Sequence, residues 1–160
     1  MVTKYDLETF MGELETLMKE NLNDYMYAID KEKSDYLLGG FNCDSYYTWS
    51  MSDIPPYPMS FFQFVGGDPV IGAASSTGYA HSLTYPIRLT CFILDTGEGN
   101  VGKIKARMNR VLLELVQEKI VKTFQDLNPE ISKMDSKLLE TAAGTVYDIA
   151  SIAFNVTFAF

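Results

Sequence analysis

Residues 82–120 read SLTYPIRLTCFILDTGEGNVGKIKARMNRVLLELVQEKI, and this stretch decides how the rest of the chain is arranged. Apolar side chains occupy every second position from Leu83 to Ile93, which is the two-residue period of a β-strand. A glycine-rich turn follows. Apolar residues then recur at steps of three and four from Ile104 to Val116, which indicates an amphipathic helix. The stretch therefore predicts a central strand, a turn, and a helix that covers the sheet.

The turn contains two patterns that are typical of phosphate-binding loops. Residues 97–102 spell G-x-G-x-x-G and residues 97–103 spell G-x-x-x-x-G-K, between a strand and a helix, where such loops occur. However, Ile104 stands where a magnesium-binding Ser or Thr is required, and Glu98 places a negative charge against the phosphates. No later strand ends in an acid, and the alternating central strand is unlike the buried parallel strands of nucleotide-binding folds. We therefore predict a flexible turn and no nucleotide or other cofactor.

Length and composition favour one acidic globular domain. The chain has 160 residues, of which 47% are hydrophobic and 13% aromatic, so it can bury a core and form broad sheet faces or subunit contacts. The formal net charge is −8, which argues against tight nucleic-acid binding because such binding relies on Lys and Arg. The negative charge is still compatible with a surface along which nucleic acid slides without binding.

The reactive side chains form no catalytic or metal-binding set. Cys43 and Cys91 are the only cysteines and are predicted to be reduced thiols of a cytosolic protein, since no secretion signal is recognisable. His81 is the sole histidine, which excludes a His-rich metal site, and the carboxylates are scattered. No apolar run approaches the ~20 residues of a membrane span. We predict that the protein is not an enzyme and has no membrane segment.

The N-terminal half predicts a long helix followed by strands. Apolar residues repeat at helical spacing from about Lys4 to Asp30, with Thr3 or Asp6 as the cap. Residues 41–51 partly support a strand, and the prolines of residues 55–58 enforce an extended segment. Residues 59–65 read as a strand, and the turn at residues 66–69 predicts a hairpin with Val70 and Ile71.

The C-terminal part predicts a short helix and a closing strand. Residues 134–143 have helical spacing of Leu138, Leu139 and Ala142, ended by Gly144. From Ile152 to Phe160, large apolar residues alternate with small ones, so the large face is expected to meet the helices. The predicted fold class is α+β. It has a mixed or antiparallel sheet of about four to five strands, flanked by the long N-terminal helix and by a second helix after the central strand.

Basic residues line one face of that second helix. Lys103, Arg107 and Arg110 follow one another at steps of four and three. The face is either solvated or a contact surface for acidic groups. The candidate acidic partners are Asp24, Asp30, Glu32 and Asp35.

The order of these elements resembles the tail terminator (tail completion or neck) proteins of long-tailed bacteriophages. The resemblance is carried by the helix Leu7–Ile29, by the strand, acid, turn and helix of Tyr85–Leu115 (in particular IRLTCFILD, residues 87–95), and by the closing strand Ile152–Phe160. It lies in the layout of the chain. Residues 1–160 then form a single domain of this kind, with family-variable segments at about 31–58 and 124–145.

The resemblance implies a structural virion protein made in the host cytoplasm. Such proteins form a hexameric ring at the head-proximal end of the tail, where they stop growth of the tail tube and dock to the head-completion or neck proteins. The implied partners are further copies of the chain, the tail tube protein, the sheath in contractile tails and the neck proteins. DNA passes through the ring without specific binding, and an acidic lumen would repel it.

Residues for such contacts can be named as candidates. The candidate subunit or partner contacts are Trp49, Tyr57, Lys103, Arg107 and Arg110. The candidate lumen or contact loops contain Gly72, Gly78, Gly97, Glu98, Gly99 and Gly102. No catalytic, cofactor-binding or metal-binding residue is predicted. The alternatives are another neck, connector or tail subunit, a small ligand-binding or regulatory α/β domain, and an enzyme.

Overall fold

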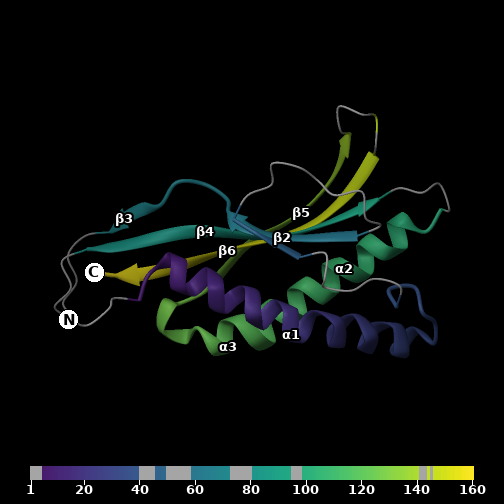
Figure 1. Cartoon of the computed structure of the whole chain (residues 1–160), viewed down its shortest axis with the longest axis horizontal. Coiled ribbons are helices and arrows are strands. Elements are labelled where there is room, and N and C mark those ends of the chain that lie inside the picture. The colour runs from purple at the N-terminus through teal and green to yellow at the C-terminus, as the bar shows by residue number, and fades with distance from the viewer. Residues whose placement is uncertain are drawn as a thin grey trace.

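The computed structural model describes residues 5–39, 46–49, 59–72, 81–94, 99–140, 144 and 146–160. Helices gather on one face of a twisted sheet, as Figure 1 shows, so the class is α+β as predicted. Within these residues, no helix has the length and apolar character that crossing a membrane requires.

The sheet of the described residues has six strands, against the predicted four to five. The strands are β1 (Tyr46–Thr48), β2 (Met59–Val65), β3 (Val70–Gly72), β4 (Ser82–Leu94), β5 (Glu130–Glu140) and β6 (Val146–Ala159). Their order is β1-β2-β4-β6-β5, and β3 also pairs with β4. β1 pairs with β2 in parallel, whereas the other pairs are antiparallel, which makes the sheet mixed. The predicted central position of β4 is confirmed.

The long helix α1 spans Leu7–Lys33, close to the predicted range. Asp6 caps its start, because its carboxylate accepts a hydrogen bond from the Thr9 backbone N–H at 3.0 Å. The other predicted cap, Thr3, lies outside the described residues. The helix ends at Ser34, whose φ of 56° is in the left-handed region.

The predicted second helix begins at Val101 and contains the apolar stretch from Ile104 to Val116. It comprises α2 (Val101–Leu115), a π-helical turn (Val116–Ile120) and α3 (Val121–Thr123), and a short 3-10 turn follows at Gln125–Leu127. α1 and the α2–α3 helix lie side by side beneath the sheet (Figure 1).

The core lies between these helices and the sheet. Phe10 of α1 makes edge-to-face ring contacts with Phe124 and with Phe158 of β6, at centroid distances of 4.9 and 6.0 Å. The helix-facing residues of β4 and β6 are almost fully buried. They include Ile87, Leu89, Cys91, Ile152, Phe154, Val156 and Phe158. The expectation that the large face of β6 meets the helices is confirmed.

The predicted hairpin between residues 59–65 and Val70–Ile71 is wrong. β2 pairs with β4 from Ile87 to Ile93, whereas β3 pairs with β4 from Ser82 to Thr84. The Gly66 N–H donates to the Pro86 carbonyl at 2.7 Å, so the chain continues along the edge of β4 and does not fold back on β2. The two strands therefore lie one after the other beside the same long strand.

The predicted helix at residues 134–143 is also wrong, because residues 130–140 form β5. This strand pairs with β6 from Glu130↔Asn155 to Glu140↔Val146, with a register shift between Ile131 and Lys133. β6 is accordingly longer than expected and begins at Val146. Pairing with a long neighbouring strand outweighs the local helical spacing.

Candidate functional site

An ion cluster joins the end of α1 to α2. The Arg107 guanidinium donates from Nη1 to Asp30 Oδ1 at 3.0 Å, and it contacts both carboxylate oxygens of Asp35 at 2.5 and 2.6 Å. The Arg107 and Asp30 side chains are 9% and 3% exposed. The Leu38 backbone N–H also donates to the Asp30 carboxylate, at 2.9 and 3.1 Å to its two oxygens. Every ionic group of this cluster is therefore hydrogen-bonded, as enclosed charges require.

The cluster shifts the pKa values of Asp35 and Arg107. Hydrogen bonding to Arg107 lowers the pKa of Asp35 from 3.8 to about 2, with a further contribution from the Leu37 N–H. The Asp35 carboxylate in turn raises the pKa of Arg107. The charge of Lys103, which is exposed, also lowers the pKa of Asp35. The basic face of α2 thus meets acidic groups of its own chain.

Arg110 extends the same pattern at the surface. Its guanidinium pairs with Glu32, and its Nε donates to Glu114 at 2.9 Å. These hydrogen bonds raise the pKa of Arg110 and lower that of Glu32. Of the four predicted acidic partners, the ion pairs use Asp30, Glu32 and Asp35.

A polar strip crosses the sheet face opposite the helices. Arg88 Nη1 donates to Asp135 Oδ2 at 2.8 Å and to Ser151 Oγ at 3.4 Å, which links β4, β5 and β6. The Thr90 and Ser151 hydroxyls are 3.0 Å apart. Arg88 lowers the pKa of Asp135.

The sequence analysis missed this strip. Arg88 and Thr90 stand between the apolar positions of the predicted central strand, but Asp135 lies within the wrongly predicted helix at residues 134–143. An alternating reading of residues 130–140 would have been the signal for it. The same sheet face also carries a small apolar cluster, formed by Phe62, Phe92, Tyr147 and Ile149.

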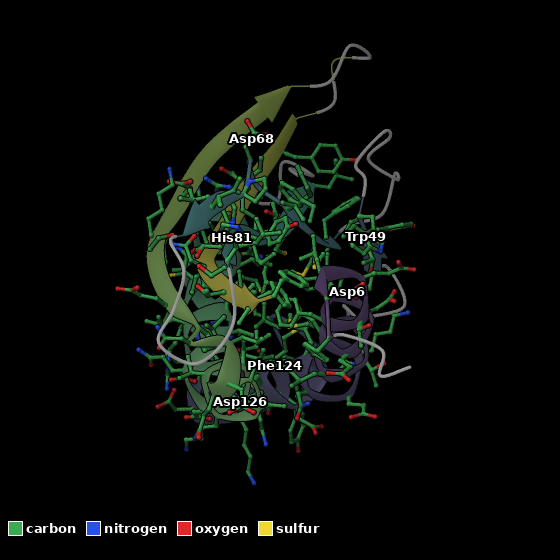
Figure 2. All side chains as sticks on the ribbon, turned by 90° about the vertical axis from the view of Figure 1, so that its left-hand side faces the viewer. Asp6, Trp49, Asp68, His81, Phe124 and Asp126 are labelled. Atoms are coloured by element: carbon green, nitrogen blue, oxygen red, sulfur yellow. The ribbon has the colours of Figure 1, made fainter. Side chains whose placement is uncertain are left out.

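Trp49 is held in an unusual conformation at the rim of the sheet. Its φ is 80°, and its N–H donates to the Gln63 carbonyl at 2.9 Å, next to the pairing of β1 with β2. Its side chain is 46% exposed, and Figure 2 shows it at the flank of the molecule. A positive φ in a bulky residue costs about 1–3 kcal/mol, so the surrounding structure must compensate for this backbone strain.

The predicted glycine loops are only partly described. Gly99 has a φ of 79°, which fits the expected turn, and Gly102 lies in the first turn of α2. Gly72 ends β3, and a Cβ there would lie 2.1 Å from Ser82 Oγ, so a larger residue would require the Ser82 hydroxyl to rotate away. Tyr57, Gly78, Gly97 and Glu98 lie outside the described residues, as does Cys43.

A hollow of about 450 Å³ lies between the start of α1 and the end of the α2–α3 helix. It is lined by Tyr5, Glu13, Thr123, Phe124, Asp126 and Leu127. The Tyr5 hydroxyl donates to Glu13 Oε2 at 2.6 Å, and burial together with this carboxylate raises the pKa of Tyr5. Figure 2 shows Phe124 and Asp126 at the helical side of the molecule.

No family model matches the chain, and no curated protein matches it. Among the described residues, no three His, Cys, Asp or Glu side chains are grouped so that they could hold a metal ion.

Proposed function

We propose that this protein is a structural virion subunit. It forms a ring at the head-proximal end of a phage tail, where it caps the tail tube and joins it to the neck. The observation that carries the proposal is the one-sided architecture. The helices cover one face of the sheet, and the polar strip on the other face has no helix over it in the described parts of the chain (Figure 1). A subunit that assembles side by side needs such open surfaces.

The charge of the chain suits a channel for DNA. The net charge is −8, and the exposed face of α1 carries Glu8, Glu13, Glu20 and Asp24. Negative surfaces repel the phosphate backbone, so DNA would pass without being held. The proposed partners are further copies of the chain, the tail tube protein, the sheath in contractile tails and the head-completion proteins.

The test is the mass and shape of the purified protein. Light scattering after gel filtration should give several subunits per particle, and negative-stain microscopy should show rings with a central hole. Addition of the rings to tail tubes should place them at one end of the tube. A compact monomer at micromolar concentration, with no ring on tail tubes, would contradict the proposal.

A small ligand-binding or regulatory domain is the second candidate, and the 450 Å³ hollow near Glu13 and Asp126 favours it. This function expects a monomer whose thermal stability rises with a ligand that fills the hollow. The nucleotide version is tested with ATP. If the parent protein binds no ATP, the glycine turn is not a nucleotide site. If it binds, Lys103→Ala should abolish binding.

A further inference from the structure

The hollow at the end of the α2–α3 helix combines an apolar part with a polar part. Phe124 and Leu127 supply the apolar part and are only 6% and 8% exposed. The polar part consists of exposed lining residues, which are Tyr5, Glu13, Thr123 and Asp126. The volume of about 450 Å³ lies at the low end of the range for small-molecule sites, about 300–1,000 Å³. The hollow therefore has room for a small ligand with an apolar body.

The charged groups of the hollow are acidic. Among the described residues that line it, Glu13 and Asp126 are carboxylates and none is basic. Within the described part of the chain, neither carboxylate forms an ion pair. The Tyr5 hydroxyl donates to Glu13 Oε2 at 2.6 Å, but a carboxylate has about four acceptor positions, so Glu13 can accept further hydrogen bonds. A positively charged ligand would find carboxylates there that no described basic residue neutralises.

The helix ends favour the same sign of charge. Thr123 ends α3, so the negative end of the dipole of the helix that begins at Val101 lies at this hollow. The positive end of α1 is also near, but Asp6 caps it and Glu8 stands in its first turn. These carboxylates offset the positive end, whereas nothing basic in the described last turns except Lys122 offsets the negative one.

The surface beside the hollow is acidic as well. A second hollow, more open than the first, shares Glu13 with it, and its described lining residues are Glu8, Thr9, Gly12, Glu13 and Thr16. A Cβ at Gly12 would meet nothing within 4 Å, so this face of α1 is open. A cation that approaches along α1 therefore meets Glu8 and then Glu13.

We propose that the hollow binds a small organic amine in its protonated form. The apolar body of the amine lies on Phe124 and Leu127, and its ammonium group donates to the carboxylates of Glu13 and Asp126. The inference rests on the ligand-binding function, the second candidate above, and names the class of its ligand. It requires no ring.

The first experiment compares three ligands that share a phenylethyl body and differ in charge. They are 2-phenylethylamine, 2-phenylethanol and 3-phenylpropanoate. Saturation-transfer NMR titrations of the parent protein at pH 7 give the three dissociation constants, and about 0.15 M NaCl screens charges that lie more than about 8 Å from the ligand. The amine should bind at least about fivefold more tightly than the alcohol, because exposed ion pairs contribute up to about this factor, and the acid should bind most weakly.

A pair of matched variants assigns this preference to the hollow. Glu13→Gln with Asp126→Asn keeps the shape of both side chains and removes both charges. It should bring the dissociation constants of the amine and the alcohol to within about twofold of each other. Glu20→Gln with Asp24→Asn makes the same change in net charge at exposed α1 positions that line neither hollow, and it should keep the preference. If both double variants lose the preference equally, the general negative charge causes it and the proposed site is refuted.

A second pair of variants tests the location without changing a carboxylate, and it also serves if the first double variant does not fold. Thr123→Trp places a large side chain at an exposed position that lines the hollow, and it should weaken binding of the amine at least about fivefold. Lys122→Trp makes a similar change at the neighbouring exposed residue, which does not line the hollow, and should not weaken it. Circular dichroism checks that the variants are folded. Unchanged binding by folded Thr123→Trp would refute the site.

The failure of the inference is distinguishable from the failure of the function on which it rests. If the alcohol or the acid binds the hollow as tightly as the amine, ligand binding stands and the preference for an amine is refuted. If none of the three compounds binds the parent, the amine site is refuted and the ligand-binding function loses its site.

Discussion

Replacing Arg107 by glutamine should lower the free energy of unfolding by about 2–3 kcal/mol. The change removes the guanidinium from Asp30, whose side chain is only 3% exposed. Glutamine keeps much of the aliphatic stem, so packing is largely retained and the loss reports on the charge.

The magnitude follows from what each carboxylate retains. Breaking an enclosed ion pair typically costs 3–5 kcal/mol because one charge stays buried without its partner. Asp30 keeps the hydrogen bonds from the Leu38 N–H, and Asp35, with 43% of its side chain exposed, regains water. The expected cost of Arg107→Gln therefore lies at or below the low end of that range.

The assay is urea unfolding at pH 7, followed by far-UV circular dichroism. Arg110→Gln is the matched control, because Arg110 lies on the same helix face but both it and Glu32 are half exposed. Exposed ion pairs contribute little, so its urea midpoint should stay close to that of the parent. Equal midpoints for the two variants would refute the reasoning.

The same cluster predicts a pH dependence. The folded-state pKa of Asp35 is lowered from 3.8 to about 2, so the unfolded chain binds its proton first as the pH falls. The stabilisation is therefore fully present above about pH 4 and is lost as the pH falls toward 2. Arg107→Gln should flatten this part of the stability curve. If parent and variant lose stability in parallel between these pH values, Arg107 does not cause the shift.

Three further outcomes are expected. Gln63→Leu should destabilise the protein by about 1–3 kcal/mol in urea unfolding, because the buried Gln63 amide accepts from the Tyr46 hydroxyl and donates to the Met11 carbonyl; an unchanged midpoint would contradict this. Gly12→Ala should stabilise by about 0.5–1 kcal/mol, since the added Cβ meets nothing within 4 Å in an exposed helix position. Burial raises the pKa of the Cys91 thiol, so peptide mapping after treatment with a thiol reagent at pH 8 should find Cys91 modified only in urea, and rapid modification of the folded protein would show that the core opens.

The sequence predicted the elements whose signal lies within consecutive residues. The apolar period of α1 and α2, the alternation in β4 and in the second half of β6, and the cap at Asp6 are all local patterns, and the structure confirms them. Their buried faces were assigned correctly because period alone decides which residues lie together.

The failures concern pairing between distant segments. The spacing of Leu138, Leu139 and Ala142 predicts a helix, yet the conformation of β5 is fixed by its pairing with β6. The turn at residues 66–69 looked like a hairpin, but the Gly66 N–H finds its partner in Pro86, twenty residues later. No local pattern contains such information.

The candidate site residues also divide into those that a local pattern reveals and those that depend on pairing between distant segments. The sequence named Arg107 and its acidic partners as candidates. The paired residues are 72 and 77 positions apart, so the sequence could not show which acid contacts which base. The strip of Arg88, Asp135 and Ser151 was missed because one of its members was assigned to the wrong element.

The ion pairs of α2 leave its basic side chains little capacity to bind a partner. Arg107 is enclosed by acids of its own chain, and Arg110 is paired with Glu32 and Glu114. A partner at this face would have to compete with carboxylates that are already in place, at a cost in the stability of the subunit. The basic helix face therefore serves to hold the end of α1 against α2 within one chain.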